Sequence, residues 1–138
     1  MKAHTTSFRV YYEDTDAGGI VYHSNYLKFA ERGRCDMLRD LGLECSTITE
    51  KLGMMFVLKH ADIEYLKPAA LDDLLEVQTM VESMRNTSFQ MRQIVHKDDE
   101  EICNMLITLV CVDANAIKPI RLPEILREKF EPYLIQED

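Results

Sequence analysis

Residues 24–42 read SNYLKFAERGRCDMLRDLG and show the clearest helical period in the chain. Apolar residues recur there at the spacing of one helix face: Tyr26, Leu27, Phe29, Ala30, Met37, Leu38 and Leu41. Ser24 or Asn25 can cap the start of the helix, and Gly42 can end it. Gly33 lies on the apolar face, where a glycine costs up to ~1 kcal/mol relative to alanine. It marks either a close approach of the helix to a packed sheet or a tolerated glycine.

The sequence after this helix has the character of β-strands. A short helical turn at 47–52 is followed by four strand-like segments, at 55–66, 74–84, 87–96 and 102–113. The separators at 85–86 and 98–100 are short enough for hairpins, so we expect an antiparallel four-strand meander. A further strand is expected before the helix, at 7–12. This order predicts an α+β domain in which a single sheet covers a single helix.

The segment 102–113 is apolar on both faces. One face holds Ile102, Leu106, Val110 and Val112, and the other holds Cys103, Met105, Ile107, Leu109 and Cys111. Because one helix covers only one face of a sheet, we expect the second face to meet another subunit, with a two-fold dimer as the default. The alternative is a monomer with unusually apolar strands. The tail at 122–134 has apolar residues at helical spacing and is expected to dock on the protein's own surface.

Composition and charge exclude several classes of function. The chain of 138 residues suits one domain, and its net charge of -8 repels the phosphate backbone of nucleic acids. No apolar run approaches the ~18–20 residues of a membrane span, and residues 1–6 are too polar for a secretory signal. The cysteines form no C-x-x-C pair and lie in apolar segments: Cys35, Cys45, Cys103 and Cys111. Buried thiols in a reducing cytosol are the simplest interpretation, so we expect a cytoplasmic protein.

The residues that can carry chemistry gather in one segment, 13–26. The chain has no G-x-S-x-G, Walker, G-x-G-x-x-G or H-E-x-x-H motif, which argues against four common enzyme classes. The segment resembles a calcium loop at Asp14, Asp16 and Gly19. It departs from that pattern at Asn25, where the twelfth position requires a bidentate glutamate, so we expect no metal site.

Asp16 is followed by two glycines and then by the start of the helix. The first N–H groups of a helix have no partner within it, and the helix dipole places partial positive charge beside them. Gly18 and Gly19 lack the Cβ atoms that would keep a ligand away from the backbone. An acyl group bound here would meet a carboxylate and hydrogen-bond donors for a developing oxyanion. A thioester suits such a site, because its carbonyl is activated and a thiolate leaves easily.

Residues 10–27, VYYEDTDAGGIVYHSNYL, resemble the signature of the hotdog-fold acyl-CoA thioesterases of the 4-hydroxybenzoyl-CoA thioesterase family. Within that family they are most similar to the bacterial branch associated with the Tol-Pal system. The core pattern D-x-D-x-x-G-x-V-Y-H-x-x-Y is highly specific and complete in this chain. The likeness continues at 62–69, 71–75, 111–114 and 118–119, so it spans nearly the whole sequence.

The resemblance implies a single hotdog thioesterase domain over residues 1–138, with a five-stranded antiparallel sheet wrapped around one long central helix. It implies a homodimer or homotetramer with active sites at the subunit interface, and neither metal nor organic cofactor. Asp16 matches the catalytic aspartate, which acts as nucleophile or general base. His23 matches the position whose backbone amide polarises the thioester carbonyl, and the role of its imidazole stays open. Gly18, Gly19, Tyr22 and Asn25 are the expected substrate-binding residues, whereas Asp14 is expected to form a local turn.

The resulting hypothesis is an enzyme that hydrolyses acyl-CoA to free acid and CoA. One alternative is a hotdog hydratase or dehydratase acting on enoyl or hydroxyacyl thioesters, although the spacing of Asp16 and His23 fits those enzymes poorly. Another is a non-catalytic module that binds an acyl ligand or acyl carrier protein. The resemblance does not carry over an acyl-chain preference, nor does it decide between CoA and acyl carrier protein as the donor.

Overall fold

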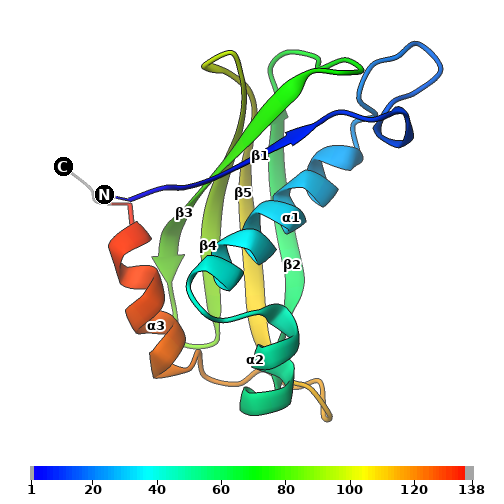
Figure 1. Cartoon of the computed structure of the whole chain (residues 1–138). Coiled ribbons are helices and arrows are strands. Elements are labelled where there is room, and N and C mark those ends of the chain that lie inside the picture. The colour runs from blue at the N-terminus through cyan, green and yellow to red at the C-terminus, as the bar shows by residue number, and fades with distance from the viewer. Residues whose placement is uncertain (1, 136–138) are drawn as a thin grey trace.

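The computed structural model describes residues 2–135, which form a five-stranded antiparallel sheet and three α-helices. The strands are β1 (His4–Arg9), β2 (Met54–Tyr65), β3 (Leu74–Met84), β4 (Ser88–Lys97) and β5 (Glu100–Asp113). The helices are α1 (Asn25–Asp40), α2 (Cys45–Leu52) and α3 (Glu124–Phe130), with single 3₁₀ turns η1 (Tyr12–Asp14) and η2 (Glu131–Tyr133). Figure 1 shows α1 lying across one face of the sheet, with α2 following at its far end.

The strand order across the sheet is β1-β3-β4-β5-β2, and each neighbouring pair is antiparallel. The predicted hairpins β3-β4 and β4-β5 are confirmed. The prediction of a four-strand meander is wrong, because β2 lies beside β5 rather than beside β3. β3 pairs with β1 and β4, so neither of its edges is open to β2. Residues 66–73 therefore carry the chain from one edge of the sheet to the other side, and β2 becomes an edge strand.

The observed elements begin and end within three residues of the predicted bounds. The largest difference is at β1, which ends at Arg9 instead of residue 12. The Asp14 carboxylate accepts the N–H of Tyr11 at 2.9 Å and draws the following residues into η1. The strand therefore stops before this turn. The helical turn expected at 47–52 begins at Cys45.

Helix α1 carries the predicted apolar face. The buried members are Tyr26, Phe29, Ala30, Met37 and Leu38, while Leu27 and Leu41 are half-buried against the core. Gly42 takes a left-handed φ of 81° just after the helix, as a helix-ending glycine does. Ser24 occupies the N-cap position but makes no side-chain capping bond. A Cβ atom at Gly33 would lie 2.8 Å from Val77 Cγ1 on β3, so the close-approach interpretation of this glycine is confirmed.

The two faces of β5 are buried to different degrees. Cys103, Met105, Ile107, Leu109 and Cys111, on the face toward the helices, are all buried. On the opposite face Ile102 and Val112 are also buried, whereas Leu106 and Val110 are half-buried. The single chain therefore covers the first apolar face fully and the second in part.

Two of the four cysteines do not have the predicted environment. Cys45 is exposed and Cys35 is half-buried, so the prediction that all four thiols are buried is wrong for this pair. The reason is that Cys45 is the first residue of α2, a short helix at the surface, and Cys35 lies on the side of α1 that faces it.

The tail docks on the protein's own surface, as predicted. Its apolar residues Leu122, Leu126 and Phe130 are buried, and the Phe130 ring centroid lies 5.2 Å from that of Phe89 on β4. Ile125, another apolar residue of this tail, is 38% exposed. No helix within residues 2–135 is long and apolar enough to cross a membrane.

Candidate functional site

The loop between η1 and α1 folds into a tight turn around the Asp16 side chain. Asp16 Oδ1 accepts the backbone N–H groups of Gly18, at 2.9 Å, and of Ile20, at 3.2 Å. The Asp16 N–H donates to the Ile20 carbonyl at 2.9 Å, and Gly19 has a left-handed φ of 79°. A Cβ at Gly18 would lie 3.3 Å from Asp16 Oδ1 and would crowd this carboxylate. The two glycines thus let the loop close around Asp16.

The crossover at 66–73 fastens this turn to the rest of the domain. The Val21 N–H donates to the Ala69 carbonyl at 2.8 Å, and the Leu71 N–H donates to the Gly19 carbonyl at 3.0 Å. The crossover is itself held by Asp73, whose carboxylate accepts the Ala70 N–H at 2.8 Å and the Lys97 ammonium at 2.9 Å. Burial raises the pKa of Asp73, but the Ala70 hydrogen bond and Lys97 outweigh it, so the net pKa is lowered.

This lowered pKa predicts an acid-sensitive anchor for the loop. A carboxyl group whose pKa is lower in the folded state contributes stability above its unfolded pKa of about 3.9, and that stability is lost as the pH falls through the folded value. We expect Asp73→Asn to lower the melting temperature at pH 7 and to flatten its decline between pH 5 and pH 3. Thermal melts of both proteins across this range check the prediction, which fails if the two pH profiles are parallel.

Asp14 and Asn25 form the support beneath the loop. Asp14 is 4% exposed, and besides the Tyr11 N–H its carboxylate accepts the Asn25 Nδ2 at 3.5 Å. Its carbonyl accepts the Tyr22 N–H at 3.0 Å. The local turn role predicted for Asp14 is confirmed. Asn25, expected to bind substrate, is buried with its amide directed to Asp14, and in the single chain it holds the loop against the start of α1.

The start of α1 offers free hydrogen-bond donors. Among residues 2–135, the backbone N–H groups of His23 and Ser24 donate no hydrogen bond to another backbone group. Both residues are exposed, and they stand at the positive end of a 16-residue helix. Tyr22 is 49% exposed, and its ring centroid lies 4.4 Å from that of His23. A developing negative charge on a ligand oxygen could be stabilised at this position.

Tyr65 is a residue of this site that the sequence did not reveal. From the end of β2, its hydroxyl donates to the His23 carbonyl at 3.1 Å. Burial raises the pKa of Tyr65, so the hydroxyl keeps its proton at neutral pH and can donate. Its ring lies edge-on to that of the buried Tyr26, with centroids 5.6 Å apart. The two partners are 42 residues apart, and only the pairing of β2 with β5 brings Tyr65 to the helix start.

Four of the six predicted site residues are exposed, whereas Gly19 is half-buried and Asn25 is buried. Asp16, Gly18, Tyr22 and His23 are exposed, and Asp16 is bound to its own loop rather than to a cation. One cavity of the described residues lies beside α1 and another lies on the sheet, and neither of these two is lined by Asp16 or His23.

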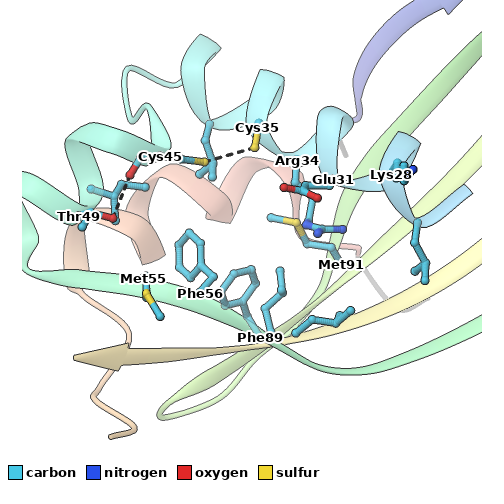
Figure 2. A pocket seen from close by; sticks show the side chains of 15 residues that line it. Lys28, Glu31, Arg34, Cys35, Cys45, Thr49, Met55, Phe56, Phe89 and Met91 are labelled. Carbon is cyan, nitrogen blue, oxygen red and sulfur yellow. Dashed lines mark hydrogen bonds between the residues drawn. The ribbon is translucent and has the colours of Figure 1, made fainter. Parts of the chain in front are cut away.

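The larger cavity, of about 420 Å³, begins one helical turn after His23, at Leu27. It lies between α1, α2 and the inner side of β2, β4 and β5 (Figure 2). Its apolar walls include Leu38, Ile48, Phe56, Phe89 and Leu109, and Lys28, Glu31 and Arg34 on α1 add polar groups. A hollow of this size and character suits an apolar group of small or moderate length.

Comparison with known proteins gives concordant results. Residues 10–130 match the thioesterase-like superfamily. The chain is 42% identical over 124 residues to the acyl-CoA thioester hydrolase YbgC of Escherichia coli O6:H1, covering 89% of this chain and 92% of that protein. It is 38% identical over 122 residues to the acyl-CoA thioesterase YbgC of Haemophilus influenzae, covering 88% and 90%.

A solved structure supports the same fold. The crystal structure of a probable thioesterase from Bartonella henselae superposes with a TM-score of 0.84 at 32% sequence identity. The match covers 88% of this chain and all of that one. The residues matched by the superfamily, 10–130, include the loop, α1 and four of the five strands.

Proposed function

The chain belongs to the thioesterase-like superfamily, and from this membership we propose that it hydrolyses acyl-CoA thioesters to a free acid and CoA. The observation that carries the proposal is the 42% identity to an acyl-CoA thioester hydrolase over nearly the full length of both proteins. The loop geometry agrees with it, because Asp16 and the free N–H groups of His23 and Ser24 belong to one short segment fastened at both ends.

We propose that Asp16 is the catalytic carboxylate. It either attacks the thioester carbonyl carbon itself or removes a proton from the water that attacks. The Gly18 and Ile20 amides hold Oδ1, which leaves Oδ2 to perform either step. The N–H groups of His23 and Ser24 stabilise the oxyanion that forms on the carbonyl oxygen, and CoA leaves as the thiolate. Gly18, Gly19 and Tyr22 line the approach to this point.

The acyl group is proposed to extend from the helix start into the cavity between α1, α2 and the sheet. The first lining residue, Leu27, follows His23 by one turn of the helix, and most of the wall is apolar. A cavity of about 420 Å³ favours acyl groups that fit within it over long chains.

We propose that Tyr65 positions the His23 backbone, and we expect Tyr65→Phe to lower kcat about 3- to 10-fold. The loss corresponds to one hydrogen bond of ~1 kcal/mol that fixes the peptide group between His23 and Ser24, whose N–H is one of the proposed oxyanion donors. KM and the melting temperature are expected to change little, because the phenyl ring keeps its packing. Tyr12→Phe is the matched control, since Tyr12 is 81% exposed. A fall in stability without a fall in kcat would assign Tyr65 a purely structural role.

A homodimer, with a homotetramer as a further step, is proposed as the active form. β2 is an edge strand, and its residues Met55 and Val57 are each more than a third exposed. They pair with Val112 and Val110 of β5, and Val110 is half-buried. A second copy of the chain would cover these side chains and enclose the open surface around Asp16. Light scattering of the purified protein measures this assembly.

The same proposal extends to the domain, the branch of the family, the cellular compartment and the acyl donor. Residues 1–138 form a single hotdog domain whose sheet wraps around α1. The chain belongs to the bacterial branch associated with the Tol-Pal system, a proposal that rests on the core motif of residues 14–26. The protein acts in the cytoplasm. Acyl carrier protein is a second candidate donor beside CoA.

The decisive experiment is a thiol-release assay with a panel of aliphatic and aromatic acyl-CoA esters. We expect CoA release with at least one ester, without added metal or cofactor. Hydration of enoyl-CoA, followed by its ultraviolet absorbance, would instead identify a hydratase. Tight binding of acyl-CoA with no release over hours would identify a binding module.

A further inference from the structure

A pair of thiols lies in contact on the wall of the cavity. Cys35 on α1 and Cys45 at the start of α2 have their Sγ atoms 3.4 Å apart, joined by a weak hydrogen bond (Figure 2). Both side chains line the cavity. The chemistry proposed for Asp16 and the helix start uses neither of them, so the pair requires a separate interpretation.

The geometry permits a covalent bond between these sulfurs. A disulfide has an S–S distance of about 2.05 Å, so the two atoms need to approach by about 1.4 Å. The link between the two helices, residues 41–44, contains Gly42 in a left-handed conformation. Cys45 itself stands at the first position of an eight-residue surface helix. A side-chain rotation together with a small shift of α2 supplies the required movement.

The two thiols differ in a way that assigns them separate tasks. Cys45 is exposed, so a reagent in solution can reach it. Cys35 is half-buried. Its pKa is raised to about 11, chiefly by burial and also by the contact with Cys45. Cys103 and Cys111 are buried in the core, where they are protected from small reagents. Reaction is therefore expected to begin at Cys45.

We propose that Cys35 and Cys45 form a reversible oxidation site that closes to a disulfide in the presence of a small organic disulfide. The Cys45 thiolate attacks one sulfur of that compound, forms a mixed disulfide and releases one thiol. Cys35 then loses its proton and attacks Cys45 Sγ, which forms the Cys35–Cys45 bond and releases the second thiol. The protein loses two electrons and two protons, and the organic disulfide gains them as two thiols. Excess dithiol reverses both steps.

Closing this bond fixes one wall of the cavity. Ile48 and Thr49 of α2 line the same cavity as the two sulfurs. A disulfide at Cys45 therefore limits the movement of α2 relative to α1. A cross-link over a separation of 10 residues also restricts the unfolded chain, which raises the stability of the oxidised form.

The test treats the reduced full-length protein with oxidised glutathione and then blocks free thiols with N-ethylmaleimide. We expect an intact mass that shows loss of two hydrogens and two fewer blocked thiols than the reduced protein. Peptide mapping is expected to join the peptides of Cys35 and Cys45. The melting temperature is expected to rise by roughly 5–10 °C and to return after treatment with dithiothreitol.

Two variants separate the steps. Cys35→Ser is expected to stop at a mixed disulfide between glutathione and Cys45, whereas Cys45→Ser is expected to acquire neither adduct nor cross-link. Because Cys45 is exposed, its substitution is expected to leave the fold intact. The proposal is overturned if the unaltered protein accumulates the mixed disulfide without closing it, if the cross-link joins other cysteines, or if no oxidation occurs while Cys45 still reacts with N-ethylmaleimide. None of these readouts depends on thioesterase activity.

Discussion

Asp16→Asn is expected to lower kcat/KM for acyl-CoA hydrolysis by about 10²- to 10⁴-fold, or roughly 3–5 kcal/mol of transition-state stabilisation. An amide has neither the charge of a nucleophile nor the basicity of a proton acceptor. It retains a carbonyl oxygen that can accept the Gly18 and Ile20 N–H groups, so the turn keeps its shape. Asp16→Ala removes this acceptor as well and is expected to lose at least as much activity. Thiol release at saturating and limiting acyl-CoA measures both effects.

Glu128→Gln is the matched control for this prediction. Glu128 is an exposed carboxylate on α3, outside the surface proposed to meet a second copy, and its substitution changes the net charge by the same amount. We expect its kcat/KM to remain within about twofold of the unaltered protein. If Asp16→Asn hydrolysed acyl-CoA at the unaltered rate with a normal melting temperature, Asp16 would have no catalytic role and the mechanism would be wrong.

Gly33→Val is expected to destabilise the folded protein by roughly 3–5 kcal/mol. Any Cβ here meets Val77 Cγ1 at 2.8 Å, and Val77 is fully buried on β3 with no space to retreat. It also crowds Gln93 Nε2, at 3.2 Å, which donates to the Ala30 carbonyl and to Thr79 Oγ1 in the same buried layer. The added side chain therefore overpacks the interface and separates buried hydrogen-bond partners. Urea unfolding followed by circular dichroism measures the change.

Arg32→Val gives the matched control for Gly33→Val on the same helix. Arg32 is exposed, so valine there changes little except helix propensity, at a cost below ~1 kcal/mol. Gly33→Ala is expected to fall between the two, because its clash is partly offset by the better helix propensity of alanine. Equal stability of Gly33→Val and Arg32→Val would show that the contact between α1 and β3 yields readily, contrary to the packing described above.

The elements that depend on near neighbours in the chain were predictable from the sequence. The apolar period of residues 24–42 gave α1 within one or two residues of its ends, because helix formation is decided by contacts three and four positions apart. The turn around Asp16 is also local, since its hydrogen bonds join residues 16, 18 and 20. The close packing of Gly33 was one of two interpretations, and the structure selected it.

The errors have a common cause in long-range contacts. Strands that follow each other in the sequence often pair when their connection is short. In this sheet β1 and β4 occupy both edges of β3, so β2 pairs with β5 instead. The same pairing of β2 with β5 places Tyr65 beside the start of α1. The exposure of Cys45 depended on where the short α2 docks, which its own eight residues do not specify.

The sequence alone determined the strand and helix content, the turn that holds Asp16 and the superfamily, because each depends on residue types at short fixed spacings. The tertiary structure decided the order of the strands, the hydrogen bond from Tyr65 to the start of α1, the approach of Cys35 to Cys45 and the cavity beside them. These features join segments that are distant in the chain. They form only when apolar side chains from several elements pack in one core and the strands pair along their free edges.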